Sequence, residues 1–198
     1  MVVELFTSQG CFDCPPADAL LRHVKATDPG ILPLDLHVTY WDNAAWRDPF
    51  SLQPATDLQS HYASLRGSIE VYTPEAVVDG RAQFVGSDQA TVAAAIARDG
   101  ATPVSVSTSN GRVFSPCRIR DRCRYSLAVW LQSGAHDESP GRREWRHDTD
   151  GSECRMQHHQ AGSWNGQPLE RSISVPAGTK FATLVQRSYG TILGAAEN

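Results

Sequence analysis

The sequence predicts an α/β protein with a C-terminal β-rich extension. Three observations indicate this fold class. An apolar, β-branched run at residues 2–6 is followed closely by a cysteine pair and then by a helical pattern. Strand and helix patterns continue to about residue 100. Beyond that point, short alternating runs and an Asn-Gly pair indicate antiparallel strands.

The first elements are a strand, a helix and a second strand. Residues 2–6 are almost wholly apolar, as in a strand buried on both faces. After the cysteines, apolar residues recur with helical spacing from position 17 to 24, and two prolines fit the first turn of that helix. We expect the second strand from Leu34 to about Trp41, because Pro33 cannot donate to a central ladder.

A second helix, a hairpin and a third helix complete this first part. Residues 54–65 place their apolar side chains on one helical face. Residues 71–78 and 83–86 predict a hairpin closed by Asp79-Gly80, a type I′ signal. Ser87 or Asp88 is expected to cap a helix running through Ile96.

The remaining residues predict a β appendage packed on the first domain. Residues 104–114 alternate around Asn110-Gly111, which indicates another hairpin. Residues 181–185 predict a late strand. We therefore divide the chain into a first domain at 1–100 and a β-rich appendage at 101–198.

Composition narrows the possible functions. The 198 residues are 40% hydrophobic and 20% charged, so the chain can form a packed core. No apolar run reaches the roughly 18–20 residues of a membrane helix. The net charge is −4, with −7 in residues 1–100 and +3 in the rest, which argues against a nucleic-acid partner. No signal peptide precedes residues 2–6, so the protein is expected in the cytoplasm if Met1 is the genuine start.

The cysteines indicate where the chemistry lies. An odd number, five, excludes a fully paired framework within the chain, and only Cys11 and Cys14 are closely spaced. Two thiols at a helix N-terminus can close a disulfide, and the positive end of the helix stabilises a thiolate. We assign nucleophilic attack on a partner disulfide to Cys11 and resolution to Cys14. Asp13 disfavours the thiolate, which predicts a relatively reducing couple.

Three functions are compatible with this pair. The first is a thiol–disulfide oxidoreductase that acts on protein or small-molecule thiols and disulfides and needs no organic cofactor. The second is a copper or zinc binding protein or chaperone that uses the same cysteines, since half of a zinc site has this spacing. The third is a scaffold with an inert structural disulfide. A Cys11→Ser variant separates them through loss of turnover, of metal or of stability alone.

Thr73-Pro74 is a candidate supporting site. An ordinary trans bend is the usual reading of such a pair, since few X–Pro bonds are cis. In a thioredoxin-like fold, however, a cis-proline loop enters the last hairpin beside the cysteine pair and offers its backbone to a peptide. Thr73-Pro74 occupies that place in the order of elements, so we predict a cis bond.

For each of the other polar and aromatic residues, the sequence allows a structural and a functional interpretation. Glu4 is either an inward carboxylate that accepts a proton from Cys14, with a pKa raised by burial, or an end-of-strand residue in solvent. His37 is either a core histidine or a polar neighbour of the site. An aromatic and acidic cluster follows the second strand, and it either packs in the core or lines a substrate groove: Tyr40, Trp41, Asp42 and Trp46.

Several stretches resemble one protein family: VVELFTSQGCFDCPPADALL (2–21), HVTYWD (37–42), WRDPF (46–50), VYTPEAVVDGR (71–81) and FVGSD (84–88). They are similar to the domain of unknown function 1223 family, whose members look like thioredoxin-fold proteins. The resemblance implies a thioredoxin-like fold with a C-terminal β-rich extension, a redox role, and a periplasmic or secreted location. The chain departs from the family at Thr39, where an aspartate is usual, and at Phe12-Asp13, where small residues are usual.

The resemblance is lost between about residues 117 and 155 and returns at 162–169 and 192–196. We interpret the intervening stretch as disordered or as the product of two compensating frameshifts. Under the frameshift hypothesis five residues are accidental: Cys117, Cys123, Cys154, His158 and His159. The alternative is a metal site that joins Cys154 and His158 to Cys117 or Cys123, although the spacing matches no recognised zinc finger.

Overall fold

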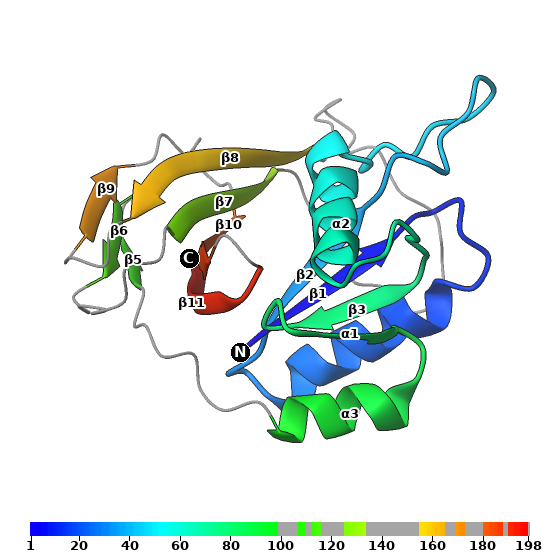
Figure 1. The fold of residues 1–198 in the computed structure, drawn as a ribbon, viewed down its shortest axis with the longest axis horizontal. Helices are drawn as coiled ribbons and strands as arrows, with labels where there is room; N and C mark the ends of the chain where they lie inside the picture. Colours follow the sequence, from blue (N-terminus) through cyan, green and yellow to red (C-terminus); the bar gives the residue numbers. More distant parts are fainter. Residues whose placement is uncertain are drawn as a thin grey trace.

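The computed structural model describes residues 1–98, 107–109, 112–115, 125–133, 155–164, 169–172, 180–187 and 190–197. The first part of the chain alternates strands and helices, as the sequence predicts (Figure 1). Its elements are β1 (Val2–Thr7), α1 (Pro15–Thr27), β2 (Leu32–His37), α2 (Gln53–Leu65), β3 (Glu75–Val78), β4 (Ala82–Val85) and α3 (Gln89–Arg98).

These four strands form one mixed sheet in the order β2-β1-β3-β4. β1 and β2 are parallel and are connected through α1, whereas β3 runs antiparallel to β1 and continues into β4 as a hairpin. The α/β prediction is therefore confirmed for this part of the chain. The sheet places the carboxyl end of β1, which leads to Cys11, beside the amino end of β3.

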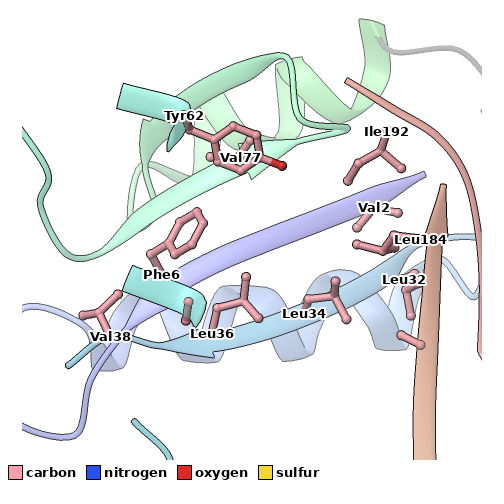
Figure 2. Close-up of a cluster of buried hydrophobic side chains, with 12 residues drawn as sticks. Val2, Phe6, Leu32, Leu34, Leu36, Val38, Tyr62, Val77, Leu184 and Ile192 are labelled. Atoms are coloured by element: carbon pink, nitrogen blue, oxygen red, sulfur yellow. The ribbon is translucent and has the colours of Figure 1, made fainter. Parts of the chain in front are cut away.

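Strand β1 is buried along its whole length, because both faces of the sheet are covered. Val3 and Leu5 face α1 and α3, where they pack with Ala17 and Val92. The alternate residues face α2 and the strands β10 and β11, in a second apolar cluster (Figure 2). That cluster comprises Val2, Phe6, Leu32, Leu34, Leu36, Val38, Ala55, Tyr62, Val77, Ala182, Leu184 and Ile192. The predicted double burial of this strand is confirmed.

The later strands form two antiparallel sheets. One has the order β11-β10-β7-β8, and the other β5-β6-β9. Their bounds are β5 (Ser107–Ser109), β6 (Arg112–Ser115), β7 (Tyr125–Ser133), β8 (Arg155–Trp164), β9 (Leu169–Ser172), β10 (Lys180–Arg187) and β11 (Ile192–Glu197). The backbone N–H of Ile192 donates to the carbonyl of Asp79 at 2.9 Å, so the C-terminal hairpin is joined directly to the β3–β4 turn.

The second strand differs from its prediction. β2 begins at Leu32 and ends at His37, whereas a strand from Leu34 to about Trp41 was expected. Pro33 lies inside it, paired with Val3. The missing N–H is tolerated because β2 is the edge strand of its sheet and needs only one ladder.

The predictions for the Asp79-Gly80 turn and for the cap of α3 are confirmed. Asp79 and Gly80 both have positive φ, 47° and 64°, as a type I′ turn requires. Asp88 caps α3 by accepting from the backbone N–H of Thr91 at 3.1 Å. The predicted turn at Asn110-Gly111 lies outside the described residues, although β5 and β6 pair on either side of it.

Part of the stretch from 117 to 155 is described. Residues 125–133 form β7, which pairs with both β8 and β10. Cys117, Cys123 and Cys154 lie outside the described residues. Across the ranges given above, no helix combines the length and the apolar character needed to cross a membrane.

Candidate functional site

The two cysteines lie together at the N-terminus of α1 and are joined by a disulfide, with their Cα atoms 5.5 Å apart. Cys14 is the N-cap residue, and its carbonyl accepts from the N–H groups of Ala17 and Asp18. The backbone N–H of Cys11 donates to the carbonyl of Ser8 at 3.1 Å. Both cysteines are buried, with 1% and 0% of their surface exposed. The predicted position of the pair at the start of a helix is confirmed.

Thr73-Pro74 forms a cis peptide bond, as predicted. Pro74 lies near the first turn of α1: a Cβ placed on Gly86 would be 3.2 Å from the Cβ atoms of both Pro74 and Ala17. The hydroxyl of Thr73 accepts from the indole Nε1–H of Trp41 at 2.8 Å. These contacts place the cis-proline segment beside the start of the cysteine helix.

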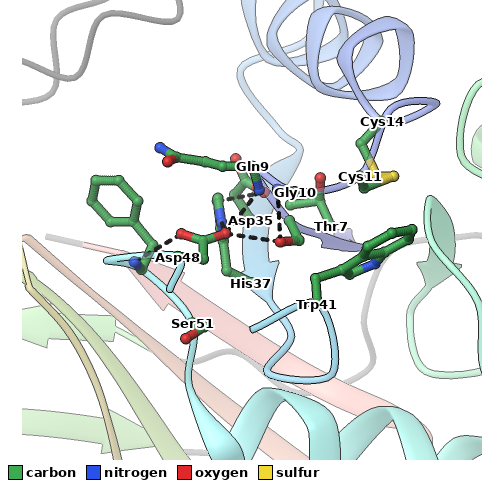
Figure 3. A network of polar contacts seen from close by, with 12 residues as sticks. Thr7, Gln9, Gly10, Cys11, Cys14, Asp35, His37, Trp41, Asp48 and Ser51 are labelled. Atoms are coloured by element: carbon green, nitrogen blue, oxygen red, sulfur yellow. Dashed lines mark hydrogen bonds and ion pairs between the residues drawn. A yellow bond between two sulfur atoms is a disulfide. The ribbon is translucent and has the colours of Figure 1, made fainter. Parts of the chain in front are cut away.

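Two tryptophans pack on the residue before Cys11. A Cβ placed on Gly10 would be 2.9 Å from Cζ3 of Trp46 and 3.3 Å from Cβ of Trp41. Any larger residue at position 10 would require the indole of Trp46 to shift. Because Trp41 also bonds Thr73, it connects the cysteine loop to the cis-proline segment. Figure 3 shows Trp41 beside Gly10 and the two cysteines.

A buried carboxylate fixes these loops to one another. Oδ2 of Asp48 accepts from the backbone N–H of Gln9 at 2.8 Å and from the hydroxyl of Ser8 at 3.1 Å, and it lies 2.7 Å from Nδ1 of His37 (Figure 3). Its Oδ1 accepts from the backbone N–H of Phe50 at 3.0 Å. The loop that follows β2 is thereby held against the loop that carries Cys11.

His37 and Asp48 have shifted pKa values. Burial alone would lower the pKa of His37, but the hydrogen bond to Asp48 and the charges of Asp35 and Asp48 raise it. Burial alone would raise the pKa of Asp48, but His37 and two backbone N–H donors lower it. His37 is therefore buried, as the core interpretation expects, and it is also linked to the cysteine loop through Asp48.

A further carboxylate lies in the first turn of the cysteine helix. Asp18 follows Cys14 by one helical turn, and its Oδ1 accepts from the hydroxyl of Thr7 at 3.0 Å. Burial raises its pKa to about 6, and the charge of Asp35 adds to this effect. Asp18 was not among the residues that the sequence singled out.

Glu4 points inward, so the reading that placed it in solvent is wrong. Its Oε2 accepts from the hydroxyl of Tyr62 on α2 at 2.8 Å, and burial raises its pKa to about 8. Its Oε1 is buried and has no hydrogen-bond partner within the part of the chain that the structure describes. Glu4 faces Tyr62 on α2, whereas Cys14 is the N-cap of α1, whose Ala17 and Leu21 pack in the other apolar cluster.

A second buried glutamate supports the cis-proline segment. Oε2 of Glu75 accepts from Nε2 of Gln59 at 2.7 Å, and the same Nε2 donates to the carbonyl of Tyr72 at 2.7 Å. Oε1 of Glu75 lies 2.9 Å from a guanidinium nitrogen of Arg66. The residue before Thr73 is thus anchored from α2.

Cys11 and Cys14 lie at the start of α1 with Thr73 and Pro74 beside that helix, whereas the hydrogen bond described for Glu4 is to Tyr62 on α2. Sequence reasoning missed Asp48, although it lies within the WRDPF stretch, because its partners are contributed by segments far apart in the chain. Among the described residues, no group of three or more His, Cys, Asp or Glu side chains is arranged to hold a metal. His158 lies on β8, and the other proposed ligands of the late metal site fall outside the described ranges.

The comparisons with known proteins give one family and one structure. The family model described as "Protein of unknown function (DUF1223)" matches residues 2–131. A crystal structure of a protein from Agrobacterium tumefaciens, a structural genomics target, is similar to this chain with 26% identity and a TM-score of 0.73. The match covers 99% of this chain and 92% of that one. The comparison with curated proteins gives no match.

Proposed function

The chain belongs to the family of proteins of unknown function DUF1223, and we propose that it is a thiol–disulfide oxidoreductase that cycles Cys11 and Cys14 between dithiol and disulfide. The observation that carries this proposal is the Cys11–Cys14 disulfide at the N-terminus of α1, with the cis Thr73-Pro74 segment beside that helix. A structural disulfide needs neither of these surroundings.

In the first step, the Cys11 thiolate attacks one sulfur of a partner disulfide. A Cys11–partner disulfide forms, the partner's own S–S bond breaks, and the leaving thiolate takes a proton from solvent. The Cys14 thiolate then attacks Sγ of Cys11, forms the Cys11–Cys14 bond and releases the second partner thiolate. Two electrons pass from the dithiol to the partner, and a dithiol reductant is needed to restore the starting state.

The surroundings of the pair set its driving force. The N-terminus of α1 favours the thiolate of Cys11, because the positive end of the helix dipole lies there. Asp13 lies between the cysteines and disfavours a second negative charge. We therefore place the couple among the more reducing members of the range known for such proteins.

We also infer a thioredoxin-like fold for the first part of the chain. Its support is the parallel β1–α1–β2 unit, the antiparallel β3–β4 hairpin and the cis-proline immediately before β3. In such a fold the backbone of Thr73 pairs with an extended partner segment. We also propose a periplasmic or secreted location, which the family resemblance implies, since disulfides form and persist in such compartments.

A redox titration tests the proposal. The protein is equilibrated in thiol/disulfide buffers, its free thiols are alkylated, and mass spectrometry reports the state of Cys11 and Cys14. We expect a reversible two-electron couple between about −270 and −120 mV. Cys11→Ser must abolish reduction of a disulfide substrate, whereas Cys14→Ser must accumulate the mixed disulfide. A pair that stays oxidised far below this range, or that carries a metal mass and resists alkylation, would refute the proposal.

A further inference from the structure

Four exposed aromatic side chains lie on the segments that adjoin the disulfide. Phe12, between the two cysteines, is 90% exposed, and Tyr40, Trp41 and Trp46 are each 40–41% exposed. We call these four residues the aromatic rim. Large apolar side chains gathered on one surface are typical of a binding site rather than of scattered surface residues.

The two tryptophans of the rim are held in place by contacts with neighbouring residues. Trp46 packs on Gly10, and Trp41 donates to Thr73. The side chain of Asn43 accepts from the backbone N–H of Trp46 at 3.1 Å, which closes the turn between the two tryptophans. Asp48 ties the far end of this loop to Gln9. The tryptophan part of the rim is therefore preformed, and a partner needs little free energy to order it.

The depth of the disulfide limits what can reach it. Cys11 and Cys14 are buried while the aromatic side chains around them are exposed. We expect a partner sulfur that reaches the disulfide to pass the exposed side chains of Phe12, which adjoins Cys11, and of the two tryptophans that pack on Gly10. A small polar disulfide has no apolar side chains with which to cover those rings.

The charges near the rim favour a neutral or basic partner. Asp13 is exposed beside Phe12. Arg47 is exposed, but it lies 3.4 Å from Asp42 and is largely compensated by it. One negative charge is left at the edge of the rim, so acidic segments are disfavoured.

We propose that the aromatic rim binds an extended polypeptide segment of a client protein, with apolar side chains next to its cysteine and no acidic ones. This inference rests on the proposed function and names its substrate class. Exposed apolar residues beside a cysteine are typical of incompletely folded chains, because folding buries them. The rim thus selects clients that have not yet buried their disulfide.

Single-turnover kinetics with two peptide substrates test this inference. Each substrate is a symmetric disulfide of two identical peptides, with leucine and phenylalanine beside the cysteine in one and serine in the other. The protein is reduced with dithiothreitol and freed of it, and formation of Cys11–Cys14 is followed by alkylation and mass spectrometry. We expect the second-order rate constant to be at least about tenfold higher for the apolar peptide.

A matched pair of variants assigns that preference to the rim. Phe12→Ala removes a side chain that is almost wholly exposed, and we expect it to lower the apolar-to-polar rate ratio by about fivefold or more. Ile69→Ala removes an apolar side chain that is 97% exposed on the segment before Thr73, and it must leave the ratio unchanged. Glutamate next to the apolar residues of the peptide should reduce its rate.

The outcomes separate the two proposals. If the protein reduces neither peptide, the proposed oxidoreductase function is wrong. If it reduces both at the same rate, or if Phe12→Ala and Ile69→Ala behave alike, the rim is not a client site. If Phe12→Ala instead dissociates an oligomer seen by sedimentation and changes no rate ratio, the rim is a contact between copies of this chain.

Discussion

Burial of Glu4 makes the stability of the protein depend on pH, and the replacement Glu4→Gln tests this. Glu4 is fully buried on the α2 face, and its pKa is raised from 4.5 to about 8, mainly by burial. Glutamine keeps the shape and can still accept from Tyr62, but it cannot ionise. The variant therefore isolates the cost of ionising this one carboxyl group.

The sign and size follow from proton linkage. Below pH 4.5 the carboxyl is protonated in both states, and its contribution to stability is fully present. As the pH rises from 4.5 to about 8, the carboxyl group of Glu4 loses its proton in the unfolded chain but keeps it in the folded protein. The stabilising contribution of Glu4 is lost over this range. Between about pH 5 and pH 8 the free energy of unfolding should fall by about 3–4 kcal/mol on account of Glu4 alone.

Urea unfolding at several pH values measures this loss in the wild type and in Glu4→Gln. Asp18, whose pKa is raised to about 6, also titrates in this range, and the pKa of His37 is raised as well. Both residues are present in both proteins, so their effects cancel in the difference. Equal stability near pH 5 and a more stable variant near pH 8 are expected. Tyr62→Phe is a second check, because loss of the hydroxyl that lowers the pKa of Glu4 should extend the dependence to higher pH. Parallel pH profiles for the wild type and Glu4→Gln would show that Glu4 is ionised in the folded protein.

Three further changes test other parts of the structure. Asp48→Asn removes the charge that faces His37 and weakens the bond to Gln9. We expect it to lower the free energy of unfolding in urea by about 2–3 kcal/mol, and near-wild-type stability would contradict the anchoring role. Gly80→Ala should lower the free energy of unfolding by about 2 kcal/mol or more, because Gly80 has a φ of 64° and a Cβ there would lie 2.0 Å from a backbone oxygen. An unchanged melting temperature would refute this close approach. Gly10→Ala should displace the indole of Trp46 and so change the tryptophan fluorescence. We expect the free energy of unfolding to fall by about 1 kcal/mol, and an unaltered spectrum would show that Trp46 does not pack on Gly10.

Local signals predicted the first hundred residues well, because each element there is specified by its own neighbours. The helix at 54–65 and the turn at Asp79-Gly80 depend on periodicity and turn chemistry alone. The start of β2 could not be predicted, because Pro33 is acceptable only on an edge strand, and the strand order is a property of the whole sheet. β7 and β8 were missed because their sequences do not alternate clearly, and their pairing joins segments far apart in the chain.

Local sequence also predicted some residues of the candidate site and not others. The cysteine pair and the cis Thr73-Pro74 bond were predictable, since a short motif and its place in the element order indicate both. Asp48 was not, because an aspartate in a polar loop usually faces water, and nothing local shows that its partners are Gln9 and His37.

Buried and half-buried carboxylates, together with the packing of Trp41 and Trp46 on Gly10, hold the loops around the disulfide. Asp48 bonds the segment before Cys11, Asp18 bonds the end of β1, and Glu75 acts through Gln59 on the residue before Thr73. Loops expose too many polar backbone groups to be fixed by an apolar core, so carboxylates that accept from N–H and O–H donors are an effective way to position them. A buried acid left with one partner removed is costly, so each of these bonds also resists displacement of its loop. The surroundings of Cys11 and Cys14 should therefore lose their order when an acid is neutralised, before the sheet beneath them unfolds.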